Sequence, residues 1–582
     1  MNYAKSSELR DAVAALSPYF RRAALFSLCS SLLVLAPSGY MLEVYDRVVT
    51  SRSLMTLFML TLLVVGAYVV MEVLEWAIAS LMHDAGLALD RKMADRVFNA
   101  IFTANLRRVA GGGMQTMSDF KTVRDFLSSP VLVATMEVPS AVVFLVLIFF
   151  ISPLLGCVAI VGAIVQVALG WFNEKSTQPA LVAANRSASA AQLYADNTLR
   201  NAQVIESMGM LKDVHRRWLE KQREFLGLQA LASERAGGYM AIMKFWQLTM
   251  SSMLLGLGAL LLLQHELAGG SGMMIVGSIL GGRVLAPLIQ IVGQWRTVVN
   301  VRDAWARLDQ VLAAIPPKPQ SMALPPPKGA VRVEAIAASA PGSTIPILRG
   351  VAFALQPGEV LGVIGPSASG KTTLARLLTG LWPAATGKVR LDGADVHTWD
   401  KAELGPHVGY LPQGVELFDG TLAENIARFG EVEPAKVHAA ARAVGLHDAI
   451  MELPEGYDSP VGREGAMLSG GQRQRVGLAR AIYGDPAFVV LDEPNSSLDE
   501  AGDAALAAAI VALKARGTTF VVMTHRTSVL AVVDKLLILA DGQQHAFGPR
   551  DEVLANLNKA AAQAQQARQR AAEPRALPAA NA

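Results

Sequence analysis

The pattern of hydrophobic positions divides the chain into two parts of different character. In the first part, six apolar runs are long enough to cross a bilayer. They cover residues 23–45, 54–82, 130–151, 154–172, 240–263 and 273–295. In the second part, short apolar segments alternate with helix-like segments, which is typical of an α/β domain. We therefore predict a membrane domain of six helices followed by an α/β domain.

The loops between the apolar runs differ in length and charge. Among the short connections and their immediate flanks, only Arg47 and Arg52 are strong cations, whereas the long connections at 83–129 and 173–238 carry many. Cytoplasmic loops are rich in Lys and Arg, so we expect the long loops, both termini and the second part of the chain in the cytoplasm.

The long loops show helical patterns, most clearly at 87–102 and 193–228. We expect helices that continue well past the membrane and turn back in the cytoplasm. Gly111–Gly113 and Ile205–Met210 are candidate turning points that dock on the second part of the chain. Plain solvent-exposed loops at these positions are an equal alternative.

A few ionisable residues interrupt the apolar runs. Charge inside a membrane is costly and usually faces a cavity or a partner. These residues are therefore candidates for a translocation path, and structural ion pairs or positions below the bilayer are the alternatives. The candidates are Glu72, Glu75, Glu137, Lys244 and Arg283.

Proline and composition mark the predicted domain boundaries. Pro316-Pro317 and Pro325–Pro327 bracket a stiff linker, and the chain becomes rich in Ala, Gln and Arg near Lys559. The expected divisions are a short N-terminal segment, a transmembrane domain, a linker, the α/β domain and a tail, at 1–20, 21–312, 313–329, 330–558 and 559–582.

A glycine-rich loop at 365–372 follows a buried strand at 359–364 and precedes a helix at 374–378. Strand, loop and helix in this order form the context in which backbone N–H groups bind phosphate. Lys371 would neutralise phosphate charge and Thr372 would ligate Mg²⁺. The nucleotide-binding candidates here are Gly365, Pro366, Ser367, Ala368, Ser369, Gly370, Lys371, Thr372 and Thr373.

Two carboxylates end the apolar strand at 488–491. Asp492 suits a contact with Mg²⁺, and Glu493 suits the general base that activates the attacking water. Pro494 and the sequence Ser497-Leu498-Asp499 follow, which disfavours an ordinary turn. ATP and Mg²⁺ are the expected ligands.

With these motifs in place, the chain resembles the ABC transporter family. The resemblance implies a glutamine that senses Mg²⁺ at Gln413, a switch histidine at His525 and the D-loop aspartate at Asp499. The pentapeptide Leu468–Gln472 resembles the signature sequence that binds the γ-phosphate held by another subunit. Ser469, Gly470, Gly471 and Gln472 are its predicted contacts, and they imply a homodimer.

One position departs from the family pattern. The aromatic residue that usually stacks on adenine is replaced by Ala340, with aliphatic residues such as Ile347 nearby. Stacking is then absent or replaced by aliphatic contacts, so selectivity for the base could be loose.

Within the family, the chain resembles type I secretion ATPases of the alkaline-protease-exporter group. The resemblance rests on Tyr45–Val48, Leu280–Arg283, Pro287, Gly293–Arg296 and Glu493–Ser496. It implies export of unfolded polypeptides with uncleaved C-terminal signals, often calcium-binding repeat proteins. The expected partners are a periplasmic adaptor, an outer-membrane channel and membrane lipid.

Composition supports a membrane protein and narrows the partners. Of the 582 residues, 52% are hydrophobic and 17% charged, and the net charge of +3 gives no indication of nucleic-acid binding. Only about twenty residues precede the first run, so we expect no N-terminal peptidase domain of the kind found in bacteriocin exporters. An exporter of lipids or small hydrophobic molecules shares these motifs and is the main alternative.

Overall fold

A computed structural model describes residues 7–107, 113–267, 270–317, 322–341, 343, 345–462, 465, 467–524, 526–557 and 559. The chain divides into two compact units near residue 317, and each is described by itself. Gly111, Gly112, His525 and nearly all of the predicted tail lie outside the described residues.

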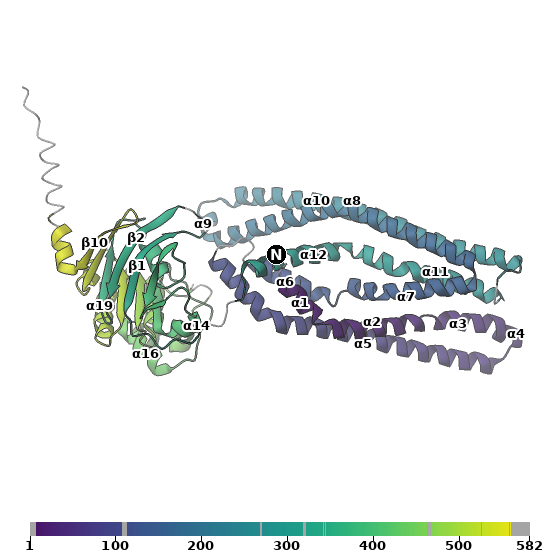
Figure 1. The fold of residues 1–582 in the computed structure, drawn as a ribbon, viewed down its shortest axis with the longest axis horizontal. Helices are drawn as coiled ribbons and strands as arrows, with labels where there is room; N and C mark the ends of the chain where they lie inside the picture. Colours follow the sequence, from purple (N-terminus) through teal and green to yellow (C-terminus); the bar gives the residue numbers. More distant parts are fainter. Residues whose placement is uncertain are drawn as a thin grey trace, which may run out of the picture. The chain divides into compact units, whose positions relative to one another are not determined.

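The first unit is entirely helical (Figure 1). Its helices are α1 (Glu8–Ala14), α2 (Ser17–Leu33), α3 (Ala36–Glu43), η1 (Val44–Val48), α4 (Val49–Ser51), α5 (Leu54–Leu106), α6 (Met114–Phe126), α7 (Pro130–Ile151), α8 (Pro153–Arg200), α9 (Ala202–Ser207), α10 (Leu211–Leu263), α11 (Gly270–Gly293) and α12 (Trp295–Ala314). Within the described residues, six helical segments are long and apolar enough to span a membrane. The six predicted spans are therefore confirmed.

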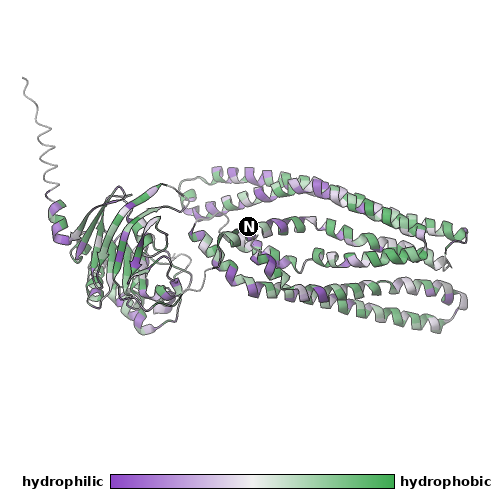
Figure 2. Ribbon diagram, viewed as in Figure 1, coloured by the Kyte–Doolittle hydropathy of each residue, from purple (hydrophilic) through white to green (hydrophobic). Residues whose placement is uncertain are grey.

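Several of these helices are much longer than a bilayer requires. The 53 residues of α5 and of α10 each extend about 80 Å, against a hydrocarbon core of about 30 Å. Figure 2 shows α8 and α10 apolar at one end and increasingly hydrophilic toward α9. The first predicted span is broken between α2 and α3, where Pro37 lies in the first turn of α3.

Side-chain packing inside this unit forms separate cores. One core joins α1, α5, α6 and α12 through side chains such as Leu9, Val97 and Leu308. Another joins α7, α8, α10 and α11 through Ile148 and Leu254. Many large apolar side chains on α5 are exposed, as expected of a helix that faces lipid.

The second unit is an α/β domain with two sheets. Its strands are β1 (Val331–Ser339), β2 (Pro346–Leu355), β3 (Val360–Ile364), β4 (Thr386–Leu391), β5 (Ala394–Asp395), β6 (Val408–Leu411), β7 (Phe488–Asp492), β8 (Thr519–Met523), β9 (Lys535–Ala540) and β10 (Gln543–Pro549). Its helices are α13 (Lys371–Leu378), α14 (Lys401–Leu404), η2 (Gly405–His407), α15 (Leu422–Ile426), α16 (Pro434–Ala443), α17 (His447–Met451), η3 (Gly456–Asp458), α18 (Gly470–Ile482), α19 (Glu500–Lys514) and α20 (Thr527–Leu530).

The larger sheet has the order β10-β9-β3-β8-β7-β6, and the strands from β9 to β6 are parallel. The smaller sheet, β2-β1-β4-β5, is antiparallel. Parallel strands buried on both faces have nearly continuous apolar sequences, as in β3 and β7. Their carboxyl ends therefore place the residues that follow β3 and β7 at one edge of the sheet.

Candidate functional site

The glycine-rich loop connects the end of β3 to the start of α13. Lys371 folds back over this loop, and its Nζ donates hydrogen bonds to the carbonyl oxygens of Gly365 at 2.8 Å and Pro366 at 3.0 Å. Gly370 begins the helix with φ of 98°, a conformation that glycine adopts without strain. The loop thus curls around an ammonium group at a helix N-terminus, which is the arrangement that binds phosphate.

The start of the loop lies close to its surroundings. A Cβ atom at Gly365 would collide with the carbonyl group of Leu539 on β9 and with the hydroxyl of Ser369. Ser369 is buried, and its Oγ has no hydrogen-bond partner among the described residues. A buried polar atom without a partner is costly, so this hydroxyl remains available to an incoming ligand.

Asp492 and Thr372 fit the requirements of a magnesium ion. Asp492 is only 1% exposed, and neither of its carboxylate oxygens accepts a hydrogen bond from a described residue. Burial raises the pKa of Asp492, and the neighbouring Thr372 hydroxyl lowers it in part. A bound cation would compensate this buried carboxylate. Carboxylate and hydroxyl oxygens are also the donors that Mg²⁺ accepts.

Glu493 lies beside the predicted magnesium-sensing glutamine. Gln413 Nε2 donates a hydrogen bond to Glu493 Oε2 at 3.2 Å. The Glu493 backbone is left-handed with φ of 53°, and its N–H donates to the carbonyl of Met523 at 3.0 Å. Left-handed backbone at a non-glycine residue costs free energy and is typical of functional sites. This backbone conformation directs Glu493 away from the direction of β7, whereas the Asp492 side chain stays buried.

A buried polar network that the sequence analysis missed supports Glu493 from behind. Gln474 Nε2, on α18, donates to the carbonyl oxygen of Pro494 at 2.9 Å. Asn495 Nδ2 donates to Asp503 at 2.7 Å, and the Thr524 hydroxyl donates to Asn495 Oδ1 at 3.3 Å. Gln474, Asn495, Asp503 and Thr524 are all buried. Polar residues within otherwise apolar segments were the sequence signal that could have identified them.

The same network fixes the residues on both sides of His525. The Arg526 N–H donates to the Thr524 hydroxyl at 3.1 Å, and the Arg526 side chain pairs with Asp503 at 3.2 Å. His525 itself lies outside the described residues, so its predicted role stays a prediction.

The signature residues form the start of α18. The Ser469 hydroxyl accepts from the Gln472 N–H at 3.2 Å, and Gln472 Oε1 accepts from the Ser469 N–H at 2.9 Å. This reciprocal capping box fixes the helix N-terminus, where N–H groups point outward. A Cβ atom at Gly471 would come within 3.1 Å of the Ser497 carbonyl oxygen, so glycine allows the two loops to approach closely.

An ion pair links the signature helix to Asp499. Arg475 on α18 contacts the Asp499 carboxylate at 2.5 Å, and Asp499 also accepts from the Gly502 N–H at 2.9 Å. These two contacts, the Gly502 bond first, lower the pKa of Asp499. Arg475 was not among the predicted residues. It links Asp499 to the helix whose N-cap is Ser469.

The site residues fall into two groups within one copy of the chain. One group contains the glycine-rich loop with Asp492, Glu493 and Gln413, and the other contains residues 469–472 with Asp499. Among the described residues, no hydrogen bond or ion pair joins 469–472 to 365–373.

A polar cavity of about 650 Å³ lies within the membrane unit. It brings together three of the predicted path residues, Glu75, Glu137 and Arg283. Glu72 and Lys244 do not line this cavity, so the structure does not group them with the other three. The lining also contains polar residues that the sequence analysis missed, namely Ser27, Ser30, Ser31, His83, Ser128, Ser140 and Gln290.

The serines of α2 form a continuous polar stripe on this cavity. Ser27, Ser30 and Ser31 are each less than 9% exposed. Spacings of three and four residues place side chains on one face of a helix. This spacing, inside an apolar run, was the signal that could have identified them.

Comparisons with known proteins agree with this architecture. Residues 23–281 match the ABC transporter transmembrane region family and residues 348–496 match the ABC transporter family. A solved bacterial Atm1-family ABC exporter with ATP bound has the same fold, with a TM-score of 0.80 and 21% identity over 98% of this chain and 100% of that chain. The fold and the nucleotide site together define an ABC transporter.

Relatives with curated names indicate the group within this class to which the chain belongs. The type I secretion system ATP-binding protein PrsD of Rhizobium meliloti (strain 1021) is 40% identical over 551 residues, 94% of each chain. The cyclolysin secretion/processing ATP-binding protein CyaB of Bordetella pertussis is 28% identical over 547 residues, 91% of this chain and 75% of CyaB. The chain belongs to the ABC transporter family, in its type I secretion group.

These findings confirm the predicted family and fold class. The protein is a multi-pass inner-membrane protein that binds ATP and couples its hydrolysis to transport.

Proposed function

We propose that the protein exports unfolded polypeptides across the bacterial inner membrane as the ABC component of a type I secretion system. The ATPase domain and both chain termini lie in the cytoplasm, and the working unit is a homodimer. The names of PrsD and CyaB as secretion proteins support this proposal. The exported polypeptides carry C-terminal signals, and calcium-binding repeat proteins are the favoured class.

ATP hydrolysis requires groups that bind phosphate and a group that activates water. Lys371 and the loop N–H groups would bind the β- and γ-phosphates, and Thr372, Asp492 and Gln413 would hold Mg²⁺. When bound, Mg²⁺ neutralises charge on the phosphates. Glu493 accepts a proton from the attacking water. His525 completes the site beside the γ-phosphate.

The two separate groups of site residues favour a composite site in the dimer. Ser469, Gly470 and Gly471 of one copy bind the γ-phosphate held by Lys371 of the other. Asp499 moves with them because Arg475 ties it to the same helix. ATP thus closes the dimer, and hydrolysis reopens it.

The membrane cavity is the observation that favours polypeptide over lipid. A lipid or drug site is expected to be mainly apolar. Here, serine hydroxyls, Glu75, Glu137 and Arg283 line the cavity together with apolar residues such as Ile78 and Phe144. Such groups replace the hydrogen bonds that a peptide backbone loses when it leaves water. The cavity therefore suits an unfolded chain better than an acyl chain.

The proposed path continues through other proteins. A periplasmic adaptor and an outer-membrane channel complete the route to the outside. Lipid surrounds the exposed apolar face of α5. The turning segment around α9 exposes Val204 and Met208, and the docking of this segment on an ATPase domain stays a prediction.

The proposal is tested with the full-length protein in lipid nanodiscs. We expect a reduced, carboxymethylated polypeptide that stays unfolded to stimulate ATP hydrolysis, and short-chain phospholipids and hydrophobic dyes to leave it unchanged. Ser30→Leu should weaken the stimulation because it makes the cavity wall apolar. Leu32→Ile, at an exposed position on the same helix, is the matched control. Stimulation by lipid or dye alone would reject polypeptide export.

A further inference from the structure

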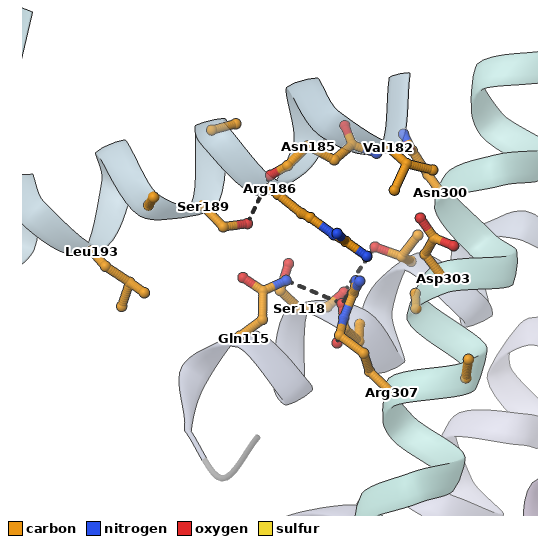
Figure 3. Close-up of a pocket in the computed structure, with 16 residues that line it drawn as sticks. Gln115, Ser118, Val182, Asn185, Arg186, Ser189, Leu193, Asn300, Asp303 and Arg307 are labelled. Carbon is orange, nitrogen blue, oxygen red and sulfur yellow. Dashed lines mark hydrogen bonds and ion pairs between the residues drawn. The ribbon is translucent and has the colours of Figure 1, made fainter. Parts of the chain in front are cut away.

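A second large cavity, of about 800 Å³, lies between α6, α8 and α12 of the helical unit (Figure 3). Asn185, in its wall, is 32 residues from the start of α8 at Pro153, or about 48 Å along the helix. The hydrocarbon core is only about 30 Å thick. By the proposed topology, this cavity therefore lies on the cytoplasmic side, beyond the membrane and separate from the serine-lined cavity.

Two polar contacts hold the three helices around this cavity. Asp119 on α6 is 2% exposed and accepts hydrogen bonds from Arg307 on α12 at 2.8 and 2.7 Å. Asn185 on α8 donates to Asn300 on α12 at 2.9 Å. Gln115 adds a third bond to Asp119, at 3.1 Å. These bonds fix the three helices around the cavity.

Two charged side chains of the cavity remain without such contacts. Arg186 and Asp303 have no hydrogen bond or ion pair among the described residues. In Figure 3, Arg186 extends from α8 across the cavity toward Arg307 and Asp303. The charge of Arg307 is balanced by Asp119. Arg186 is therefore the cation that is free to pair with an incoming group.

The rest of the lining matches the chemistry of a peptide backbone. Gln115, Asn185 and Asn300 carry amides, which both donate and accept hydrogen bonds as peptide groups do. Between them the wall is built of small residues, which allow a main chain to approach: Ser118, Ala188, Ser189, Ala190, Ala304 and Ala306. The volume is in the range of about 300–1,000 Å³ that is typical of ligand sites.

We propose that this cavity binds an extended segment of the polypeptide to be exported, before the segment reaches the membrane, and that Arg186 pairs with an acidic side chain of that segment. Asn185, Asn300 and Asp303 hold its backbone. This inference rests on the proposed function, since it takes the transported molecule to be a polypeptide. A lipid headgroup is disfavoured because Asn185 lies about 48 Å along α8, beyond a bilayer that measures about 40–45 Å with its headgroups.

The test measures peptide binding to the full-length protein in nanodiscs by fluorescence anisotropy. The probes are a labelled, unstructured Gly-Ser peptide with spaced Asp residues and a twin with Lys in place of Asp. We expect Arg186→Gln to weaken binding of the Asp peptide by about tenfold or more, because a hydrogen-bonded charge is lost. Arg186→Lys should retain most of the affinity, and Arg186→Glu should reverse the preference toward the Lys peptide.

The matched control is Arg302→Gln, which removes a cation beside Asp303 that does not line the cavity. It should bind both probes as the wild type does. Equal affinity of wild type and Arg186→Gln for the Asp peptide would overturn the site, and so would an unchanged preference in Arg186→Glu. Neither result contradicts the proposal of polypeptide export if unfolded polypeptide still stimulates ATP hydrolysis. If unfolded polypeptide does not stimulate ATP hydrolysis by the wild type, the proposal of polypeptide export is rejected.

Discussion

Replacement of Glu493 by glutamine separates water activation from nucleotide binding. The side chain keeps its size, and its amide oxygen can still accept the hydrogen bond that Gln413 donates at 3.2 Å. The left-handed backbone at φ of 53° and its bond to Met523 do not depend on the side chain. Glu493→Gln should therefore preserve the geometry of the site and remove only the group that accepts a proton.

The expected loss follows from the contribution of a general base. Such a group accelerates a reaction by about 10²–10⁴-fold, which corresponds to about 2.7–5.5 kcal/mol in the activation free energy. We expect the kcat for ATP hydrolysis to fall by that factor and ATP affinity to change by only a few-fold. The ATP-bound dimer should accumulate because it closes but cannot reopen.

The measurements are phosphate release and binding of a fluorescent ATP analogue, both with the full-length protein in nanodiscs. Glu500→Gln is the matched control because it changes an exposed carboxylate at the start of α19, and it should hydrolyse ATP like the wild type. Hydrolysis by Glu493→Gln within a few-fold of the wild type would refute the role assigned to Glu493.

Three further predictions concern the same nucleotide site. Because burial raises the pKa of Asp492 in the folded state, its charge opposes folding at pH values above that pKa, and the penalty is lost as the pH falls from that pKa to the lower pKa of the unfolded chain. Asp492→Asn should therefore stabilise the nucleotide-free protein at neutral pH. The gain comes from loss of the buried charge, and each kcal/mol shifts Tm by about 2–4 °C in a domain of this size. The same variant should lose the stabilisation by ATP with Mg²⁺, and an unchanged Tm and ATP response in a thermal scan would contradict both statements. Lys371→Ala and Ser469→Arg should each abolish hydrolysis, yet co-assembled dimers of the two variants should regain one intact site and a measurable fraction of activity. Inactive mixed dimers would argue against a composite site. The wild type should hydrolyse GTP at a rate comparable with that of ATP hydrolysis, and Ala340→Tyr should shift the preference toward ATP. Strict ATP selectivity in the wild type would show that another group recognises the base.

Sequence alone predicted those features that follow from local pattern. Six apolar runs became six helical segments long enough to span a membrane, because hydrophobic length is a direct consequence of bilayer thickness. The glycine-rich loop was recognisable because strand, loop and helix are adjacent in the chain. Glu75, Glu137 and Arg283 were visible as charges in apolar runs, and the structure brings them to one cavity.

Features that depend on tertiary contacts were not predictable. Glu72 shares a helix with Glu75, yet only Glu75 lines the cavity, because rotation about the helix axis is set by packing. Arg475 was missed because its partner Asp499 lies on a separate element. The break between α2 and α3 was missed for a different reason, because its signal, Pro37, is local and was overlooked. The cavity between α6, α8 and α12 was not predictable, because the hydrogen bonds Asn185–Asn300 and Arg307–Asp119 join residues more than a hundred positions apart.

Export of polypeptides is tested most directly by the set of proteins that cells secrete. The gene is deleted and then complemented with the wild type or with Glu493→Gln, and the proteins in the medium are compared. The account predicts that at least one protein disappears on deletion, returns with the wild type and stays absent with Glu493→Gln. An unchanged set of secreted proteins, together with altered drug sensitivity or lipid distribution, would contradict it.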